Sequence, residues 1–136
     1  MSNLTTVVKC GKEKLLEILL DPIKYNLTEY DKMEKITETS FIQYFGKNNE
    51  LKMTYDIVYD MKNNTVRIVI VNENSNVEII LFKILQFGSL EVKVEVLDEI
   101  YVKGFMQQTQ IKFLKLIGAN DESLNSLVNH LNELVK

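Results

Sequence analysis

The side chains best suited to catalysis are scarce in this sequence, which has one histidine, His130, and one cysteine, Cys10. A catalytic zinc site requires about three protein ligands, and a cysteine nucleophile requires a base or cations that favour its thiolate. His130 lies beside the apolar stripe of a helical pattern near the end of the chain, without a second histidine. Lys9 and Lys12 flank Cys10 and could lower its pKa, but no base is close in sequence. The sequence therefore predicts structural roles for both residues, with no catalytic residue, no metal site and no cofactor.

Tyrosines and a methionine offer a different chemistry, because Tyr44, Tyr55 and Tyr59 alternate with other residues in a strand-like region that also holds Met53. A buried tyrosine hydroxyl requires a hydrogen-bond partner, so three inward tyrosines exceed what a dry core needs. Aromatic and thioether side chains can line an adaptable cavity in which the hydroxyl groups orient a ligand. A filled core is the alternative interpretation.

Two charged residues, Glu38 and Lys83, are assigned to the same inward face by the strand register given below. An unpaired charge buried there would cost several kcal/mol. Each is therefore expected to lie at the cavity mouth, to pair, or to be turned outward by a β-bulge. An inward Lys83 would be the best candidate to meet an acidic head group on a ligand.

The 136 residues fit one domain spanning residues 1–136, and 46% hydrophobic residues suffice for a core. A net charge of −3 provides no general attraction for a phosphate backbone, so we expect no nucleic-acid partner. One cysteine excludes a disulfide within the chain. No signal-peptide pattern occurs at the start, and no apolar run approaches the roughly 20 residues that span a bilayer. We expect a cytoplasmic protein without membrane insertion.

The pattern of apolar residues divides the first two thirds of the chain into a strand, two short helices and an antiparallel meander. Asn3 to Lys9 predicts the first strand, and residues 12–20 a helix. Asp21 and Pro22 stop that helix and favour a second one, as N-cap and first helical residue. Period-two alternation and Asn- or Gly-containing turns then predict five strands, at about 35–46, 50–60, 65–72, 76–85 and 90–98, of which the first can bend into two.

Two-residue hairpin loops would place one continuous apolar set on the same face of the sheet. That inward set is Ile42, Tyr44, Met53, Tyr55, Ile57, Tyr59, Val66, Ile68, Ile70, Ile79, Leu81, Val92, Val94 and Val96. The solvated face would carry charges together with five apolar residues, Val69, Val71, Ile80, Phe82 and Ile84. Because an exposed apolar patch usually marks an interface, these five predict a homodimer.

After Ile100 the period returns to helical, and apolar residues recur on one stripe to Val135. The first part of the stripe contains Val102, Phe105, Met106, Thr109, Phe113 and Leu116. A helix of about 30 residues would be about 45 Å long and must lie across the apolar sheet face. Gly118 to Asp121 interrupts the pattern and predicts a kink, or a new helix capped by Asp121.

This order of elements resembles the START/Bet v 1-like helix-grip (SRPBCC) superfamily, and the stretch from Leu20 through Asp21-Pro22 to Tyr25 looks like the turn after its first helix. The resemblance implies an α+β helix-grip fold, with a curved antiparallel sheet of six to seven strands around a long C-terminal helix and two short helices after the first strand. The Lys- and Asn-rich composition, with Arg67 as the one arginine, favours an archaeal, crenarchaeal branch.

Members of this superfamily bind apolar molecules between sheet and helix, so the resemblance implies a lipid- or polyketide-like ligand and transfers no catalytic residue. The predicted ligand-binding residues are Ile42, Tyr44, Met53, Tyr55, Ile57, Tyr59, Ile68, Ile70, Leu81, Lys83, Val94, Phe105, Met106, Thr109 and Phe113. Two alternatives stay open: a cyclase- or hydrolase-type enzyme that uses polar residues of the cavity, and a protein-interaction module with a filled core. A pair of inward polar residues within hydrogen-bond reach would favour the enzyme.

Overall fold

The computed structural model describes residues 2–25, 32–45, 48, 51–72, 76–101 and 119–136. Within them the chain forms one antiparallel sheet and three helices. The strands are β1 (Ser2–Val8), β2 (Lys32–Lys35), β3 (Ser40–Phe45), β4 (Leu51–Asp60), β5 (Thr65–Asn72), β6 (Val77–Phe87) and β7 (Val92–Tyr101). The helices are α1 (Lys12–Leu20), α2 (Pro22–Tyr25) and α4 (Ala119–Leu134).

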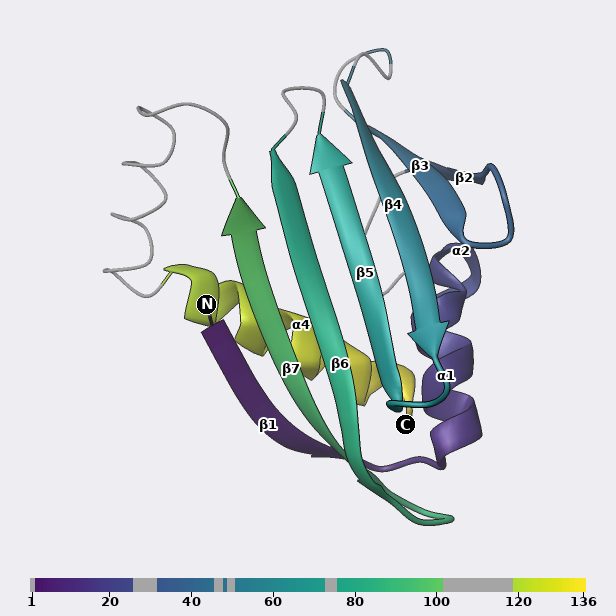
Figure 1. Cartoon of the computed structure of the whole chain (residues 1–136), viewed down its shortest axis with the longest axis vertical. Helices are drawn as coiled ribbons and strands as arrows, with labels where there is room; N and C mark the ends of the chain where they lie inside the picture. The colour runs from purple at the N-terminus through teal and green to yellow at the C-terminus, as the bar shows by residue number, and fades with distance from the viewer. Residues whose placement is uncertain (1, 26–31, 46–47, 49–50, 73–75, 102–118) are drawn as a thin grey trace.

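The seven strands have the order β1-β7-β6-β5-β4-β3-β2, which is a meander from β2 to β7 with β1 added beside β7. The sheet curves, and α4 lies diagonally behind it (Figure 1). Two short helices follow the first strand, as the sequence predicts. The strand expected at 35–46 corresponds to β3, whereas β2 (Lys32–Lys35) precedes the predicted range and was not expected. The predicted α+β architecture is confirmed.

The core lies between the inner face of the sheet and the helices. Val8, Phe82 and Val96 are fully buried on the sheet, and Leu15 of α1 and Leu131 of α4 are fully buried against it. Fully burying one such side chain stabilises the fold by about 1.5–3 kcal/mol. The first part of the predicted C-terminal helix, including Phe105, Met106, Thr109 and Phe113, lies outside the described residues.

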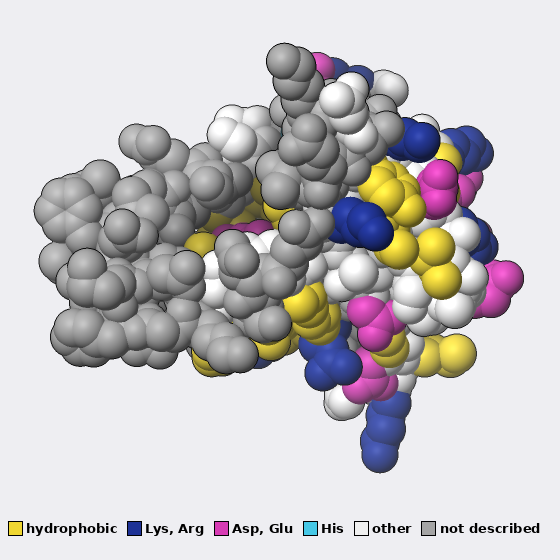
Figure 2. Space-filling model, turned by 90° about the horizontal axis from the view of Figure 1, so that it is seen from above, with side chains coloured by type: hydrophobic (Ala, Val, Ile, Leu, Met, Phe, Trp, Pro, Cys, Tyr) yellow, Lys and Arg dark blue, Asp and Glu magenta, His cyan; other side chains and the backbone are white. Residues whose placement is uncertain are grey.

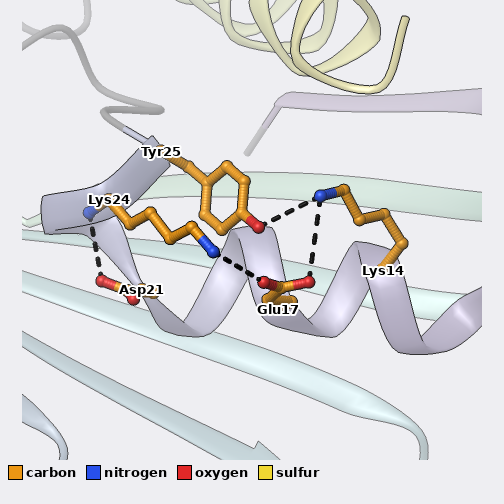
Figure 3. A network of polar contacts seen from close by, with 5 residues as sticks. All are labelled: Lys14, Glu17, Asp21, Lys24 and Tyr25. Atoms are coloured by element: carbon orange, nitrogen blue, oxygen red, sulfur yellow. Dashed lines mark hydrogen bonds and ion pairs between the residues drawn. The ribbon is translucent and has the colours of Figure 1, made fainter.

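A polar network holds α1 and α2 together at the Asp21-Pro22 corner (Figure 3). The Lys24 amide donates to Asp21 Oδ1 at 3.1 Å, so Asp21 caps α2 as predicted. Lys24 Nζ also lies 3.1 Å from Glu17 Oε1, and Lys14 Nζ donates to the Tyr25 hydroxyl at 3.1 Å. Because these side chains are exposed, the network orients the corner more than it stabilises the fold.

The predicted face of β3 is wrong. Phe41 pairs with Tyr55, and Ile42 pairs with Thr54, so Phe41 is buried in the core while Ile42 and Tyr44 point to the outer face. The pairing of Phe45 with Leu51 leaves residues 46–50 between them. The prediction assumed an even number of loop residues, and the structure has an odd number. This difference moves every side chain of the strand to the opposite face of the sheet.

The same correction applies to β6. Val71 pairs with Val77, which leaves the odd stretch 72–76 between them. Ile80, Phe82 and Ile84, predicted to lie outward, are therefore buried core residues. Ile79, Leu81 and Lys83, predicted to lie inward, belong to the outer face.

The inward position of Val92, Val94 and Val96 is correct, although the prediction reached it through two errors that cancel. The first error is the face of β6, and the second is the β6–β7 register. The structure pairs Val94 with Ile84, where the prediction had an odd-numbered residue of β6, and the register shifts at a bulge between Ile84 and Gln86. The β4–β5 register is as predicted, with Tyr59 opposite Val66. Tyr55, Ile68 and Val94 consequently share the buried face.

The dimer surface also needs correction, because three of its five predicted residues are core. Val69 and Val71 do lie on the outer face, where the register sets Ile79 and Val77 opposite them. Leu81 and Leu97 form the next apolar pair on this face. We call this set the outer patch: Val69, Val71, Val77, Ile79, Leu81 and Leu97. A homodimer stays a prediction.

Candidate ligand-binding cleft

A cleft of about 220 Å³ opens on the inner face where β4 begins, β5 ends, β6 begins and β7 ends. Among the described elements, α4 crosses nearer the opposite end of the sheet (Figure 1). Viewed from above, the molecule is hollowed, and acidic side chains lie in the hollow beside hydrophobic ones (Figure 2). The described residues that line the cleft are Met53, Ile70, Asn72, Asn76, Val77, Glu78 and Ile100.

The register explains why these residues meet. Glu78 of β6 is opposite Ile70 of β5 on one side and Ile100 of β7 on the other, while Met53 of β4 is opposite Asn72. The Asn72 amide donates to the Asn76 carbonyl at 3.1 Å, and the Asn76 amide donates to Asn72 Oδ1 at 3.0 Å. These bonds close the β5–β6 connection at one edge of the cleft.

The polar residues that line the cleft are Glu78, Asn72 and Asn76, and the buried carboxyl group of Asp98 lies next to Glu78. Asp98 is opposite Ile80, and Glu78 is opposite Ile100, so the two acids are diagonal neighbours on adjacent strands of the inner face. Asp98 is only 4% exposed. Burial, together with a hydrogen bond to Asp98 and the charge of Asp98, raises the pKa of Glu78 from 4.5 to about 8.

The raised pKa means that Glu78 keeps its proton at neutral pH, since burial and the neighbouring Asp98 disfavour its charged form. A protonated carboxyl group can donate one hydrogen bond and accept others. It can also transfer a proton to or from a bound molecule. The cleft thus combines apolar walls with a single acidic centre.

A second inward polar pair lies close to the acids in the sheet. The Tyr55 hydroxyl donates to Gln43 Oε1 at 2.6 Å, and Tyr55 is buried. The register places Tyr55 opposite Ile70, which borders Glu78. The buried tyrosine therefore has the hydrogen-bond partner that burial requires.

The structure brings only some of the predicted site residues to the cleft. Met53 and Ile70 line it, and Tyr55, Ile57, Tyr59, Ile68 and Val94 lie on the same inner face of the sheet. Their contact with a ligand stays a prediction. Ile42, Tyr44, Leu81 and Lys83 face the other way, and Glu38 lies exposed in the β2–β3 connection.

Sequence reasoning missed Glu78 and Asp98. Glu78 is the one charged residue in the apolar run from Val77 to Phe82, and that isolation could have marked it for attention. A correct strand register would have placed it on the inner face. Asp98 is the last residue of the strand predicted at 90–98, and no face of the sheet was assigned to it. The predicted β5–β6 connection had an even number of residues, which placed Glu78 on the outer face. The actual connection has an odd number, so Glu78 lies on the inner face beside Asp98.

The remaining candidates offer little chemistry. Burial raises the pKa of the Cys10 thiol, although Lys14 acts in the opposite direction, which disfavours a reactive thiolate. His130 is half-buried on α4. The described part of the chain contains no cluster of three residues suited to a metal ion, and none of its helices is long and apolar enough to cross a bilayer.

No family model matches the chain, and no curated protein matches it significantly. Solved structures do. A conserved protein from Geobacillus kaustophilus is 10% identical, with a TM-score of 0.71 over 98% of this chain and 93% of that one. The Zhui aromatase/cyclase from Streptomyces sp. R1128 is 10% identical, with a TM-score of 0.63 over 99% and 94%.

Norcoclaurine synthase from Thalictrum flavum, solved in complex with dopamine and hydroxybenzaldehyde, is 12% identical, with a TM-score of 0.61 over 98% of this chain and 84% of that one. These neighbours are Bet v 1-like (SRPBCC) proteins. At such identities the likeness shows the fold alone. The chain has the helix-grip fold, with a curved seven-stranded antiparallel sheet and a C-terminal helix.

Proposed function

We propose that this protein binds an apolar small molecule, of a lipid- or polyketide-like kind, in the cleft on the inner face of the sheet. The observation that carries the proposal is a cleft on the inner face with Met53, Ile70 and Ile100 in its wall. The fold supports it, because solved neighbours include an aromatase/cyclase and a synthase with two aromatic compounds bound. A crenarchaeal affiliation and a cytoplasmic location stay predictions.

The apolar wall would provide the affinity. Burying ligand surface yields about 25 cal/mol per Å², and only the surplus over the lost freedom of the ligand appears as binding. The few polar groups of the cleft would then decide the orientation and the kind of ligand.

The proposal is tested first by native mass spectrometry of protein purified without detergent, where a co-purifying apolar compound is expected. Phenylbutanol serves as a neutral probe in calorimetric titration, and we expect it to bind. Ile100→Trp should fill the cleft and weaken that binding by about tenfold or more. Leu97→Trp, on the opposite face of the same strand, is the matched control and should bind as the parent does. Failure of the parent to bind any apolar probe would support the interaction module with a filled core.

The carboxyl pair favours a second candidate, an enzyme of the cyclase or hydrolase type. Glu78 and Asp98 are inward polar residues within hydrogen-bond reach, and a carboxyl group with a pKa of about 8 suits acid–base catalysis near neutral pH. This candidate requires turnover of a polyketide-like or ester substrate that falls by about a hundredfold or more in Glu78→Gln. Binding without turnover in a substrate panel would favour the carrier.

A further inference from the structure

We infer that the cleft selects a ligand whose polar group is uncharged, a hydroxyl or a carbonyl, and that this group lies against Glu78 at the polar edge of the cleft. The inference rests on the proposed function and narrows it to a class of ligand. It replaces the expectation of a ligand with an acidic head group, which depended on an inward Lys83.

The lining of the cleft is the first step. Apart from Glu78, its described polar residues are Asn72 and Asn76 at the β5–β6 connection, and their side-chain amides carry no charge. None of the described lining residues is basic. A ligand carboxylate would therefore leave water for a site without a described counter-charge, which is costly.

The position of Glu78 is the second step. The register sets it between Ile70 of β5 and Ile100 of β7 on the inner face, and it is half-buried. Among the described residues, the titratable group that faces it is Asp98 of β7, which is buried and does not line the cleft. Tyr55 of β4 is separated from it by Ile70. Glu78 is thus the one group of the described lining whose charge can change near neutral pH.

The charge state of Glu78 is the third step. Burial, followed by the hydrogen bond to Asp98 and the charge of Asp98, raises the pKa of Glu78 from 4.5 to about 8. About nine in ten of these carboxyl groups are then protonated at pH 7. A ligand ammonium group would have to displace this proton before it could form an ion pair, with both charges set against isoleucine side chains. A hydroxyl or a carbonyl requires no such change, because a protonated carboxyl group both donates and accepts hydrogen bonds.

Ligand binding should consequently be linked to the proton on Glu78. An apolar ligand body that covers this residue removes water from it, which disfavours the charged carboxylate more than the neutral form. The protonated protein is therefore the form that binds. The affinity for a neutral ligand should be constant up to about pH 7 and fall as the pH rises through 8.

Four probes with the same apolar body test the choice of head group, by calorimetric titration into the full chain at pH 7. Phenylbutanol and phenylbutanone are neutral, whereas phenylbutylamine and phenylbutyrate are charged. We expect each neutral probe to bind about tenfold or more tightly than either charged probe. A charged probe that binds as tightly as phenylbutanol overturns the inference and leaves the proposed function standing.

Titrations of phenylbutanol at pH 6, 7 and 9 test the part played by Glu78. The parent should lose about three- to tenfold in affinity between pH 7 and 9. Glu78→Gln, whose amide stays neutral, should bind as tightly at pH 9 as the parent does at pH 7. Glu95→Gln removes a carboxyl group from the outer face of β7 and should lose affinity at pH 9 as the parent does.

Circular dichroism at each pH checks that the titrated protein is folded, and the four-probe comparison on the parent decides if Glu78→Gln does not fold. An affinity of the folded parent that stays flat to pH 9 overturns the inference, as does a loss of affinity that persists in Glu78→Gln. If none of the four probes binds the parent at pH 7, the proposed function itself is wrong.

Discussion

Glu78 is a carboxyl group in a position that weakens the fold at high pH. It keeps its proton to about pH 8 in the folded chain and loses it near pH 4.5 when unfolded. The unfolded state therefore binds fewer protons between these values, and the free energy of unfolding falls as pH rises through this window. A shift of about 3.5 pKa units corresponds to roughly 4–5 kcal/mol.

Glu78→Gln should abolish this loss. We expect the variant to be more stable than the parent at pH 9 by about 2–4 kcal/mol, and to differ far less at pH 5. Urea unfolding followed by circular dichroism at pH 5, 7 and 9 measures it. Glu95→Gln, whose carboxyl belongs to the outer face, should follow the parent. A parent whose stability is flat from pH 5 to 8 would contradict the raised pKa.

The hydroxyl of Tyr55 supports a second prediction at this scale. Tyr55→Phe leaves Gln43 Oε1 without its 2.6 Å donor, and the loss of a donor to a partly buried acceptor costs about 1–2 kcal/mol. Tyr44→Phe is the matched control, because the Tyr44 hydroxyl lies 3.5 Å from Glu34 at an exposed site, and we expect less than about 0.5 kcal/mol there. Thermal unfolding of both variants gives the comparison, and equal losses would show that burial of the Tyr55 hydroxyl is unimportant.

At the scale of elements, composition and period were enough to predict six to seven strands, two short helices and a long C-terminal helix, because alternation and turn residues are local properties. Which face each strand buries depends on the number of residues in each connection. That number is odd between Phe45 and Leu51 and between Val71 and Val77, and asparagine-rich connections accommodate loops of several lengths. The hydrophobic strands β3 and β6 carry apolar residues on both faces, so their pattern could not reveal the error. The acid pair was missed for this reason.

The β4–β5 connection provides a prediction about one such turn. Asn64 has a φ of 51°, in the left-handed region, and its side chain accepts a hydrogen bond from Lys12 Nζ at 2.7 Å. Asn64→Gly keeps the favourable backbone and loses this bond, whereas Asn64→Ala loses both. We expect Ala to be less stable than Gly by about 1 kcal/mol. Chemical denaturation of the two variants measures the difference, and an Ala variant as stable as Gly would show that the turn rearranges at no cost.

At the scale of the whole molecule, the two faces of the sheet have different partners. Among the described elements, the helices contribute to one core with the inner face, and none of them is drawn in front of the outer face (Figure 1). The outer face is therefore where another molecule can pack, while the inner face is occupied by the fold and its cleft. The proposed ligand binding and the predicted association would therefore use opposite surfaces.

The outer patch supports the last prediction, that a second copy of the chain packs on it. Its six apolar residues lie on three adjacent strands, and charges of both signs border them, Arg67, Lys83, Asp56, Glu95 and Glu99. A two-fold axis can pack this patch against the same patch of a second copy. Sedimentation at micromolar concentration should give a dimer mass for the parent and a monomer mass for Ile79→Lys, because a charge at the centre of an apolar contact is costly to bury. Thr39→Lys, in the exposed β2–β3 connection, is the control and should stay dimeric. A monomeric parent would contradict the predicted homodimer.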